Sequence, residues 1–277
     1  MTGVDGKHRI VIERVTPEVD GGRYPIKRTI GEEVAVEADV FTDGHDLVGV
    51  ALLYRRNHDP QWIEVPMVFL TNDRWHASFP VADLGRYRYT VTGWVDHFQT
   101  WRRDFNKKID AGQNVLIELI QGARLIEEAS RRAPNAEGKS LQEWANQLQS
   151  TTMPEEARIE TALEKDMAAL MAKHPDRRFA TIYGKELVVV VDREKARFSA
   201  WYEMFPRSCS ESGGHGTFID CEARLPYVAS MGFDVLYLPP IHPIGVAHRK
   251  GKNNSPTAGP NDPGSPWAIG SADGGHK

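Results

Sequence analysis

Apolar side chains recur at every second position in short runs along the first hundred residues of the chain. The runs fall within residues 33–40, 48–54, 63–67, 75–79 and 87–93. Polar turn clusters at residues 42–46 and 71–73 separate them. A period of two predicts strands with one buried and one exposed side, and many short strands divided by turns favour an antiparallel β-sandwich. We assign residues 1–105 to this predicted N-terminal domain.

The apolar spacing changes to three and four beyond residue 105, which predicts helices. The first predicted apolar face contains Ile109, Leu116, Leu119, Ile120, Ala123 and Ile126. Thr152 and Glu155 have the spacing of a capping box, and a single helix is expected to follow over residues 155–170. We interpret residues 106–185 as an α-helical insertion. Because its apolar faces need a partner surface, a dimerisation domain and hence a homodimer are expected.

A continuous apolar run at residues 187–191 predicts a strand, and residues 186–197 are expected to return to the sandwich. Residues 198–205 predict another strand, followed by a helix capped by Thr217 and Asp220 and then by an apolar strand at residues 233–238. This order is typical of a βαβ unit in a parallel sheet. Residues 198–277 therefore predict the first βαβ of an incomplete (β/α)8 TIM barrel.

We expect the helix of this βαβ unit to bury one face. Its predicted members are Phe218, Leu225, Val228 and Met231. Gly232 follows at the position where a left-handed residue commonly ends a helix. Cys221 is expected on the buried side of the same helix.

Composition narrows the functional classes. The chain has 277 residues, 40% of them hydrophobic and 26% charged, with a formal net charge of -4. This charge gives no basic field for nucleic acid, and no apolar run reaches the ~20 residues that span a bilayer. Cys209 and Cys221 lack zinc-type spacing and suit a reducing compartment, so a cytoplasmic protein without a metal or a cofactor is expected.

In a (β/α) barrel, chemistry takes place at the C-terminal ends of the strands. Residues 204–208 and 239–245 hold these positions here, and the second segment leads into Arg249, Lys250 and Lys252. A lysine beside a glycine on such a loop suits a sugar phosphate, although a basic loop of this kind is often simply solvated.

Several segments carry a resemblance to a known family. Residues 201–208 and 232–245 resemble the first two barrel strands of the α-amylase superfamily, glycoside hydrolase family 13. With residues 249–254 and 264–271, the chain is similar to the α-1,4-glucan:maltose-1-phosphate maltosyltransferases. The resemblance covers the whole chain, because that family also begins with a β-sandwich that carries a helical insertion.

The resemblance implies retaining transfer of maltosyl from α-maltose 1-phosphate to the non-reducing end of an α-1,4-glucan. It places the nucleophile and the acid/base residue beyond Lys277, so no catalytic residue is expected in this chain and the chain alone is expected to be inactive. It also implies that Lys250 contacts the donor. Two alternatives remain: a related hydrolase or trehalose-forming enzyme, and a non-catalytic glucan-binding or dimerisation module.

Other residues have competing interpretations. Tyr87, Tyr89, Trp94, Phe98 and Trp101 could stack on sugars, but core and domain-contact roles are favoured. Glu203 and Asp234 lie within a strand and at a strand's N-terminal end, where catalysis is not expected.

Three further features of residues 198–277 have no firm functional assignment. His242 is equally compatible with a pocket and with a structural role, and Trp267 is expected to pack the tail. Residues 213–216 resemble a phosphate loop only loosely.

Overall fold

The alternating pattern of residues 33–42 produces strand β3 (Glu33–Thr42) in a computed structural model that describes residues 6–267 and 272. Val34, Val36 and Ala38 are fully buried between more exposed neighbours. Strand β3 pairs antiparallel with β1 (Ile10–Thr16) and β7 (Arg74–Pro80), and β6 (Val68–Thr71) extends the first sheet in the order β1-β3-β7-β6.

A second sheet has the order β2-β10-β8-β4-β5, with β9 paired to β8. Its strands are β2 (Ile26–Thr29), β4 (Val48–Arg56), β5 (Ile63–Pro66), β8 (Gly85–Val95), β9 (Thr181–Ile182) and β10 (Leu187–Asp192). Strand β10 runs antiparallel to β8 but parallel to β2, which differs from the fully antiparallel arrangement that we expected. A parallel pair needs a long crossover, and the strands β3–β9 and the helices between them supply it.

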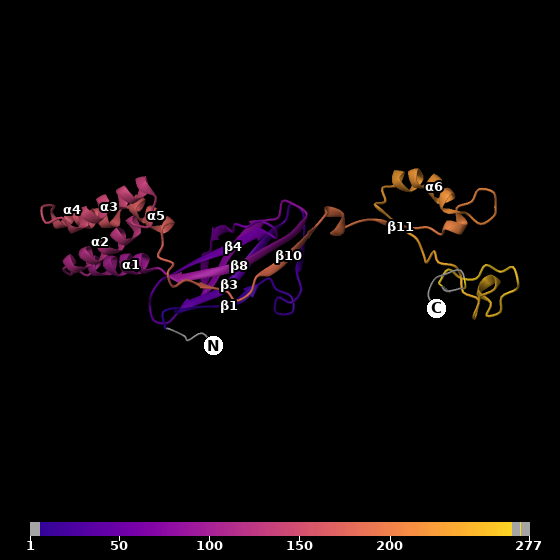
Figure 1. Cartoon of the computed structure of the whole chain (residues 1–277), viewed down its shortest axis with the longest axis horizontal. Helices are drawn as coiled ribbons and strands as arrows, with labels where there is room; N and C mark the ends of the chain where they lie inside the picture. The colour runs from indigo at the N-terminus through magenta and orange to yellow at the C-terminus, as the bar shows by residue number, and fades with distance from the viewer. Residues whose placement is uncertain (1–5, 268–271, 273–277) are drawn as a thin grey trace. The chain divides into compact units, whose positions relative to one another are not determined.

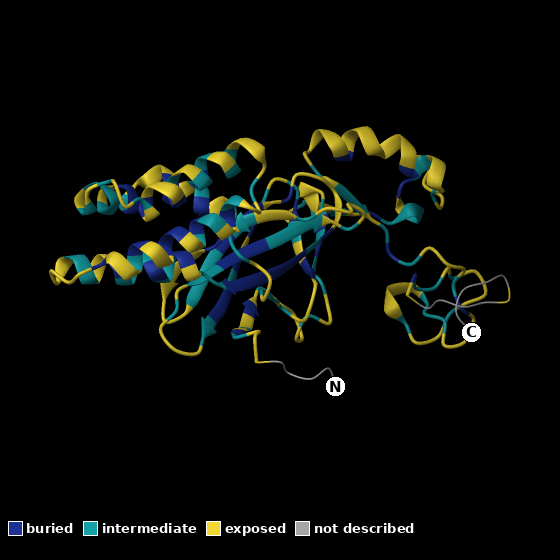
Figure 2. Ribbon diagram, turned by 60° about the vertical axis from the view of Figure 1, so that its left-hand side comes forward, coloured by how far each residue is buried: buried dark blue, intermediate teal, exposed yellow. Residues whose placement is uncertain are grey.

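The two sheets share one hydrophobic core. Leu52 and Tyr89 of the second sheet and Phe79 of the first are fully buried in it. The rings of Tyr54 and Phe79 stack across the core with their centroids 4.5 Å apart. Figure 2 shows the buried residues concentrated along these strands and on the inner sides of the neighbouring helices.

Five helices lie between β8 and β9 in the chain (Figure 1). They are α1 (His97–Asp110), α2 (Leu116–Ser130), α3 (Asn135–Gln149), α4 (Glu155–Leu163) and α5 (Lys165–Lys173). Helix α1 begins upstream of the boundary at residue 106 that we expected. Asp96 caps it by accepting a hydrogen bond from the backbone N–H of Gln99 at 2.9 Å. Phe98, Trp101 and Phe105 consequently pack among the helices.

The expected capping box of Thr152 and Glu155 is wrong. Pro154 occupies the N-cap position of α4, and no side chain caps this helix. Ser150 instead accepts the backbone N–H groups of Thr152 and Met153, so the preceding turn is closed by a different side chain. The single helix expected over residues 155–170 is two helices, because the chain leaves the helical conformation at Glu164.

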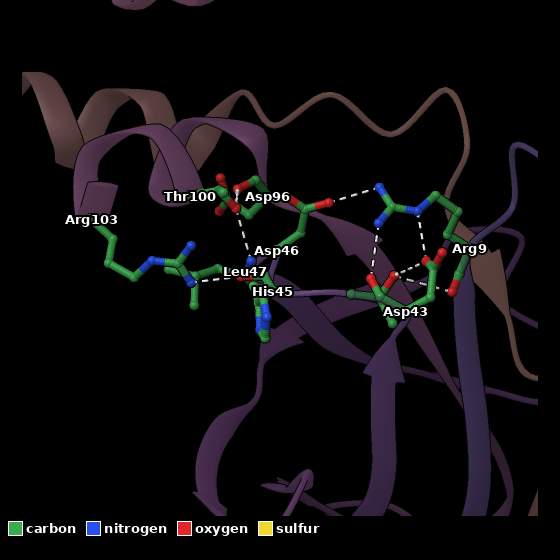
Figure 3. Close-up of polar contacts among 9 residues, drawn as sticks. Arg9, Asp43, His45, Asp46, Leu47, Asp96, Thr100 and Arg103 are labelled. Atoms are coloured by element: carbon green, nitrogen blue, oxygen red, sulfur yellow. Dashed lines mark hydrogen bonds and ion pairs between the residues drawn. The ribbon is translucent and has the colours of Figure 1, made fainter. Parts of the chain in front are cut away.

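The start of α1 is tied to the loop between β3 and β4 (Figure 3). The backbone N–H of Leu47 donates to Thr100 Oγ1 at 2.8 Å, and Arg103 Nη1 donates to the carbonyl of His45 at 2.7 Å. Arg9, just before β1, binds Asp43 and Asp46 in the same loop, each at 2.7 Å. These contacts join the helices to the sheets, and both parts belong to one compact unit, Met1–Asp192.

The second unit is Arg193–Lys277. It contains β11 (Trp201–Glu203), α6 (Phe218–Ser230), β12 (Val235–Tyr237) and three short 3-10 helices, η1 (Glu194–Ala196), η2 (Pro206–Ser208) and η3 (Lys252–Asn254). Strands β11 and β12 are parallel, as the sequence predicted, with Trp201 opposite Val235 and Glu203 opposite Tyr237. Both are shorter than predicted, since each has only the other as a pairing partner among the described residues.

Helix α6 begins with the predicted capping box of Thr217 and Asp220. Its predicted buried face is largely wrong. Val228 and Cys221 are buried, whereas Phe218 (55% exposed), Leu225 (42%) and Met231 (41%) are not. The reason is that, among the described residues, the small core of this unit includes only Cys221 of this helix. Taken together, the described residues form a mixed α/β protein with several sheets and six α-helices.

Candidate functional site

The carboxyl ends of β11 and β12 lie side by side because the two strands are parallel. The backbone N–H of Met204 donates to the carbonyl of Tyr237 at 3.0 Å and continues the pairing by one step. Residues 204–208 and 239–245, the segments that the sequence singled out, therefore leave the sheet at the same edge. In α/β folds this edge is where ligands bind.

A cavity of about 210 Å³ lies at this edge. Proline, phenylalanine and isoleucine side chains form most of its wall, and the polar lining residues are Arg207, His215 and His242. An apolar wall with a few polar groups is typical of small-ligand sites. Sequence reasoning identified the segment of Arg207 but assigned that residue no role; its position just after a strand end was the available signal.

Lys250 lies on the loop after β12, between residues 245 and 255, and is half-buried. Its side chain makes no hydrogen bond or ion pair with the residues that the structure describes. Lys250 does not line the 210 Å³ cavity, whereas His242 does. The structure thus puts Lys250 on a neighbouring loop of the same unit and His242 in the cavity wall.

The glycine-rich segment 213–216 has a packing role at Gly216 that accounts for a glycine there without a phosphate loop. Its backbone N–H donates to the carbonyl of Arg207 at 3.0 Å. A Cβ atom at position 216 would collide with the carbonyl oxygen of Pro206 and lie 2.7 Å from the backbone nitrogen of Ser210. The glycine therefore permits close backbone approach beside the cavity.

Glu203 and Asp234 lie at opposite ends of the β11–β12 pair. Asp234 lies at the N-terminal start of β12, where its Oδ2 accepts the backbone N–H of Ala200 at 3.0 Å and its Oδ1 pairs with Lys195 at 2.8 Å. The hydrogen bond from Lys195, followed by that from Ala200, lowers the pKa of Asp234. Glu203 is exposed and is the last residue of β11, so the expectation that it lies inside the strand is wrong: the register with β12 ends at this residue. The position of Asp234 at the N-terminal end of β12 is the one that the sequence predicted.

Cys209 and Cys221 lie together in the small core of the second unit, with their sulfur atoms 3.6 Å apart. Burial, followed by the hydrogen bond with Cys209, raises the pKa of Cys221 to about 11. Cys221 is therefore a protonated thiol at neutral pH and a poor nucleophile. Within the described part of the chain, no group of three His, Cys, Asp or Glu residues could hold a metal ion.

A second cavity, of about 270 Å³, lies in the first unit between the end of β8, α2 and the segment after α5. Its charged lining residues already have partners within the protein. Arg9 binds Asp43 and Asp46, and Arg178 binds Asp176 (Figure 3 shows the Arg9 contacts). Since these charged groups are already paired, they are poorly placed to bind a ligand in this cavity, and we assign no function to it.

The aromatic series of the first unit belongs to the hydrophobic interior. All five members, Tyr87, Tyr89, Trp94, Phe98 and Trp101, are buried. The guanidinium group of Arg177 covers the ring of Trp94 at 4.1 Å from its centroid. No ring in this series presents an open face to a sugar.

Trp267 in the second unit is 57% exposed and contacts the ring of Phe205 edge-on at 5.7 Å. It thus packs the segment after the Lys250 loop against the end of β11, as expected. Residues 268–271 of the quoted motif lie outside the described residues. None of the helices in the described ranges is long and apolar enough to cross a membrane.

Comparison with known proteins identifies the family. The family model for domain N/S of α-1,4-glucan:maltose-1-phosphate maltosyltransferase matches residues 8–193. Curated proteins of that name are similar over nearly the whole chain. The one from Chlorobaculum tepidum is 53% identical over 273 residues, which are 98% of this chain and 40% of the relative.

Two other relatives give the same result. The protein from Myxococcus xanthus is 48% identical over 97% of this chain, and that from Methylacidiphilum infernorum is 46% identical over 99%. The chain spans about 40% of the length of these relatives, 41% in both of these cases. The matches share one name and cover both structural units, so the chain belongs to the α-1,4-glucan:maltose-1-phosphate maltosyltransferase family.

Proposed function

We propose that this chain is the N-terminal part of a glycosyltransferase that moves a maltosyl group from α-maltose 1-phosphate to the non-reducing end of an α-1,4-glucan. The observation that carries the proposal is the 53% identity to a maltosyltransferase over 98% of the chain. The cavity and Lys250, which has no partner among the residues that the structure describes, both lie on loops after the parallel strands. They support the proposal because such folds bind ligands there.

We further propose that the two sheets are a β-sandwich that carries α1–α5 as an insertion, and that β11, α6 and β12 are the first βαβ of a (β/α)8 barrel. The parallel register of β11 and β12 supports the barrel. Their three-residue pairing and the exposed face of α6 are what a barrel's first unit has before neighbouring units cover it.

Retention of configuration needs two carboxyl groups about 5–5.5 Å apart, one as nucleophile and one as acid and base. The nucleophile would attack the anomeric carbon and release phosphate, and a glucan hydroxyl would then displace the enzyme. Neither Glu203 nor Asp234 lines the cavity, and we propose that both catalytic carboxylates lie beyond Lys277. The 277-residue chain alone is then inactive.

Lys250 is the residue that we propose to contact the donor. Its ammonium has no partner among the described residues, and it is one residue away from Gly251, beside which the backbone can be approached closely. A lysine is a compact charge suited to a phosphate or a sugar hydroxyl.

The helices supply a second proposed role, dimerisation. Helix α2 exposes Leu116, Ile117 and Ile120 on neighbouring turns, and Ile117 is 67% exposed. A second copy of the chain would cover this apolar stripe, which favours a homodimer. The two free, buried cysteines are compatible with a cytoplasmic location.

Phosphate release tests the main proposal. The full-length protein that carries this chain is given α-maltose 1-phosphate and glycogen, and release of inorganic phosphate together with lengthening of glucan chains is expected. Water in place of glycogen is the matched control. A protein that releases no phosphate, or one that hydrolyses glucan without the donor, would contradict the proposal in favour of a related hydrolase or a trehalose-forming enzyme.

A further inference from the structure

Two arginines bind consecutive carbonyl groups just beyond the Lys250 loop. Arg207 Nη1 donates to the carbonyl of Gly264, and Arg249 Nη2 donates to the carbonyl of Pro263, both at 3.0 Å. Arg207 belongs to η2, directly after β11, whereas Arg249 precedes Lys250 in the chain. Because each donor is a charged guanidinium, these hydrogen bonds are stronger than neutral ones.

Gly264 gives the arginines room to reach these carbonyls. Its φ is +77°, in the left-handed region, and an added Cβ would lie 2.8 Å from Ile244 Cγ2 and 3.0 Å from Arg249 Cγ. Any larger residue would therefore strain the backbone and press on the stem of Arg249. The close packing fixes the position of Arg249 relative to the segment that follows β12.

The loop that runs from Arg249 to Pro263 is closed by its own hydrogen bonds. The backbone N–H of Gly251 donates to the carbonyl of Ser255 at 2.9 Å, and that of Gly259 donates to Asp262 Oδ2 at 2.7 Å. A Cβ at position 251 would collide with the carbonyl oxygen of Thr257. The loop is thus a defined turn structure whose far end is attached through Arg249 and Arg207.

We propose that Arg207 and Arg249 form a clamp that positions Lys250 for the donor phosphate, and that Arg249 acts only through this loop. Arg249 is not part of the cavity lining, and its terminal nitrogen is directed to a backbone carbonyl rather than to open space. Arg207 links the clamp to the carboxyl end of β11. This inference rests on the proposed function of Lys250.

The test compares Arg249→Gln and Arg207→Gln with Arg224→Gln in the full-length protein. Arg224 lies on α6 near the ring of Tyr227 and serves as a matched control away from the loop. For Arg249→Gln we expect the KM for α-maltose 1-phosphate to rise about tenfold, as loss of one charge-assisted hydrogen bond implies. We expect kcat and the KM for glucan to change less than about twofold, and Arg249→Lys, which keeps a charged donor, to recover part of the loss.

A donor KM within about twofold of wild type in Arg249→Gln would overturn the clamp. So would an equal rise of donor and glucan KM, because a general loss of structure affects both substrates. Arg224→Gln is expected to leave every constant unchanged.

Tryptic cleavage separates failure of the clamp from failure of the proposed function, since it needs no activity. The loop contains three cleavage sites, Arg249, Lys250 and Lys252; Arg249→Gln removes the first and leaves the other two, which are the ones compared. A released loop is cut at both sites several times faster than in wild type or in Arg224→Gln. Equal cleavage rates would overturn the clamp even in a protein that releases phosphate, whereas faster cleavage in a protein without phosphate release would retain the clamp and reject the transferase.

Discussion

The two units of the chain bury their apolar side chains to very different degrees. Unit Met1–Asp192 has two large cores, one between the sheets and one among α1–α5. Among the described residues of unit Arg193–Lys277, the one core cluster consists of Met204, Cys209 and Cys221, while Phe198 and Ile219 are about 80% exposed (82% and 79%). Burial of apolar surface is the main stabilising contribution to a fold.

The unit with the larger cores and the unit that carries the proposed donor site are therefore different parts of the chain. The first unit has two large cores, and the charged residues that line its 270 Å³ cavity already have partners within the protein. The second unit carries the 210 Å³ cavity and Lys250 but little core of its own. The proposed donor site therefore lies in the unit with the smaller described core.

The largest expected difference between the two units is in the hydrogen-exchange rates of their backbone amides in the 277-residue chain. Amides of β4 and β8 are expected to exchange at least about a thousandfold more slowly than those of β11 and β12, because local opening of a thin core is easy. Mass spectrometry of peptides from both units measures this ratio. Comparable protection in the two units would show that the second unit is as stable as the first.

Truncation of a buried ring should affect the first unit strongly. Phe105 is fully buried among the helices, and Phe105→Ala is expected to lower the free energy of unfolding by about 3–5 kcal/mol. Phe198→Ala, at an exposed position in the second unit, is the matched control and should leave the main urea transition unchanged. A small effect at Phe105 would mean that the helical core is not part of the cooperative unit.

Overpacking in the same core has a smaller expected effect. Gly122 of α2 packs directly under the indole of Trp101, and a Cβ there would collide with the ring. Gly122→Ala is expected to lower the free energy of unfolding by about 1–3 kcal/mol, despite the higher helix propensity of alanine. Gly184, around which a Cβ meets nothing within 4 Å, gives the control variant Gly184→Ala. Equal stability of the two variants would contradict the close contact of α1 and α2.

The smallest predicted effect concerns Asp96, the N-cap of α1. Burial raises its pKa, against the opposing effect of hydrogen bonds from Gln99 and Phe98. Because the folded pKa lies above the unfolded value, the protonated form stabilises the fold at low pH, and that contribution is lost as pH rises through the folded pKa. Asn is an equally good cap without the charge, so Asp96→Asn should be as stable as wild type or more stable at pH 7, with any advantage vanishing in acid.

Asp96→Ala, in contrast, should lose about 1 kcal/mol at pH 7 because the cap is removed. Urea unfolding at pH 7 and at low pH measures the free energy of unfolding of both variants. If Asp96→Asn were as unstable as Asp96→Ala at pH 7, the carboxylate charge itself would be required.

Local patterns predicted the parts of this fold that are encoded locally. The alternation of Val34, Val36 and Ala38 predicted β3, and Thr217 with Asp220 predicted the start of α6. The start of α1 was missed because buried aromatic residues at 94, 98 and 101 suit either a strand end or a helix, and only the capping bond of Asp96 distinguishes them.

The pattern of apolar and polar residues could not predict contacts between segments far apart in the chain. The parallel pairing of β2 with β10 joins segments some 160 residues apart in the chain, as the register of Ile26 with Val189 shows. The sequence predicted the two segments that follow β11 and β12, and the role of Lys250 stays a prediction. The arginine contacts to residues 263 and 264 were not predicted, because which carbonyl a long side chain reaches depends on how the loop closes.

The proposal for the donor site is tested most directly by kinetics of Lys250→Ala beside Lys252→Ala in the full-length protein. Both variants remove one positive charge from the same loop, so they share any general electrostatic effect. The account predicts that Lys250→Ala raises the KM for α-maltose 1-phosphate by about tenfold or more, whereas Lys252→Ala changes it by less than about threefold. Equal effects of the two variants, or no effect of Lys250→Ala, would contradict a specific donor contact at Lys250.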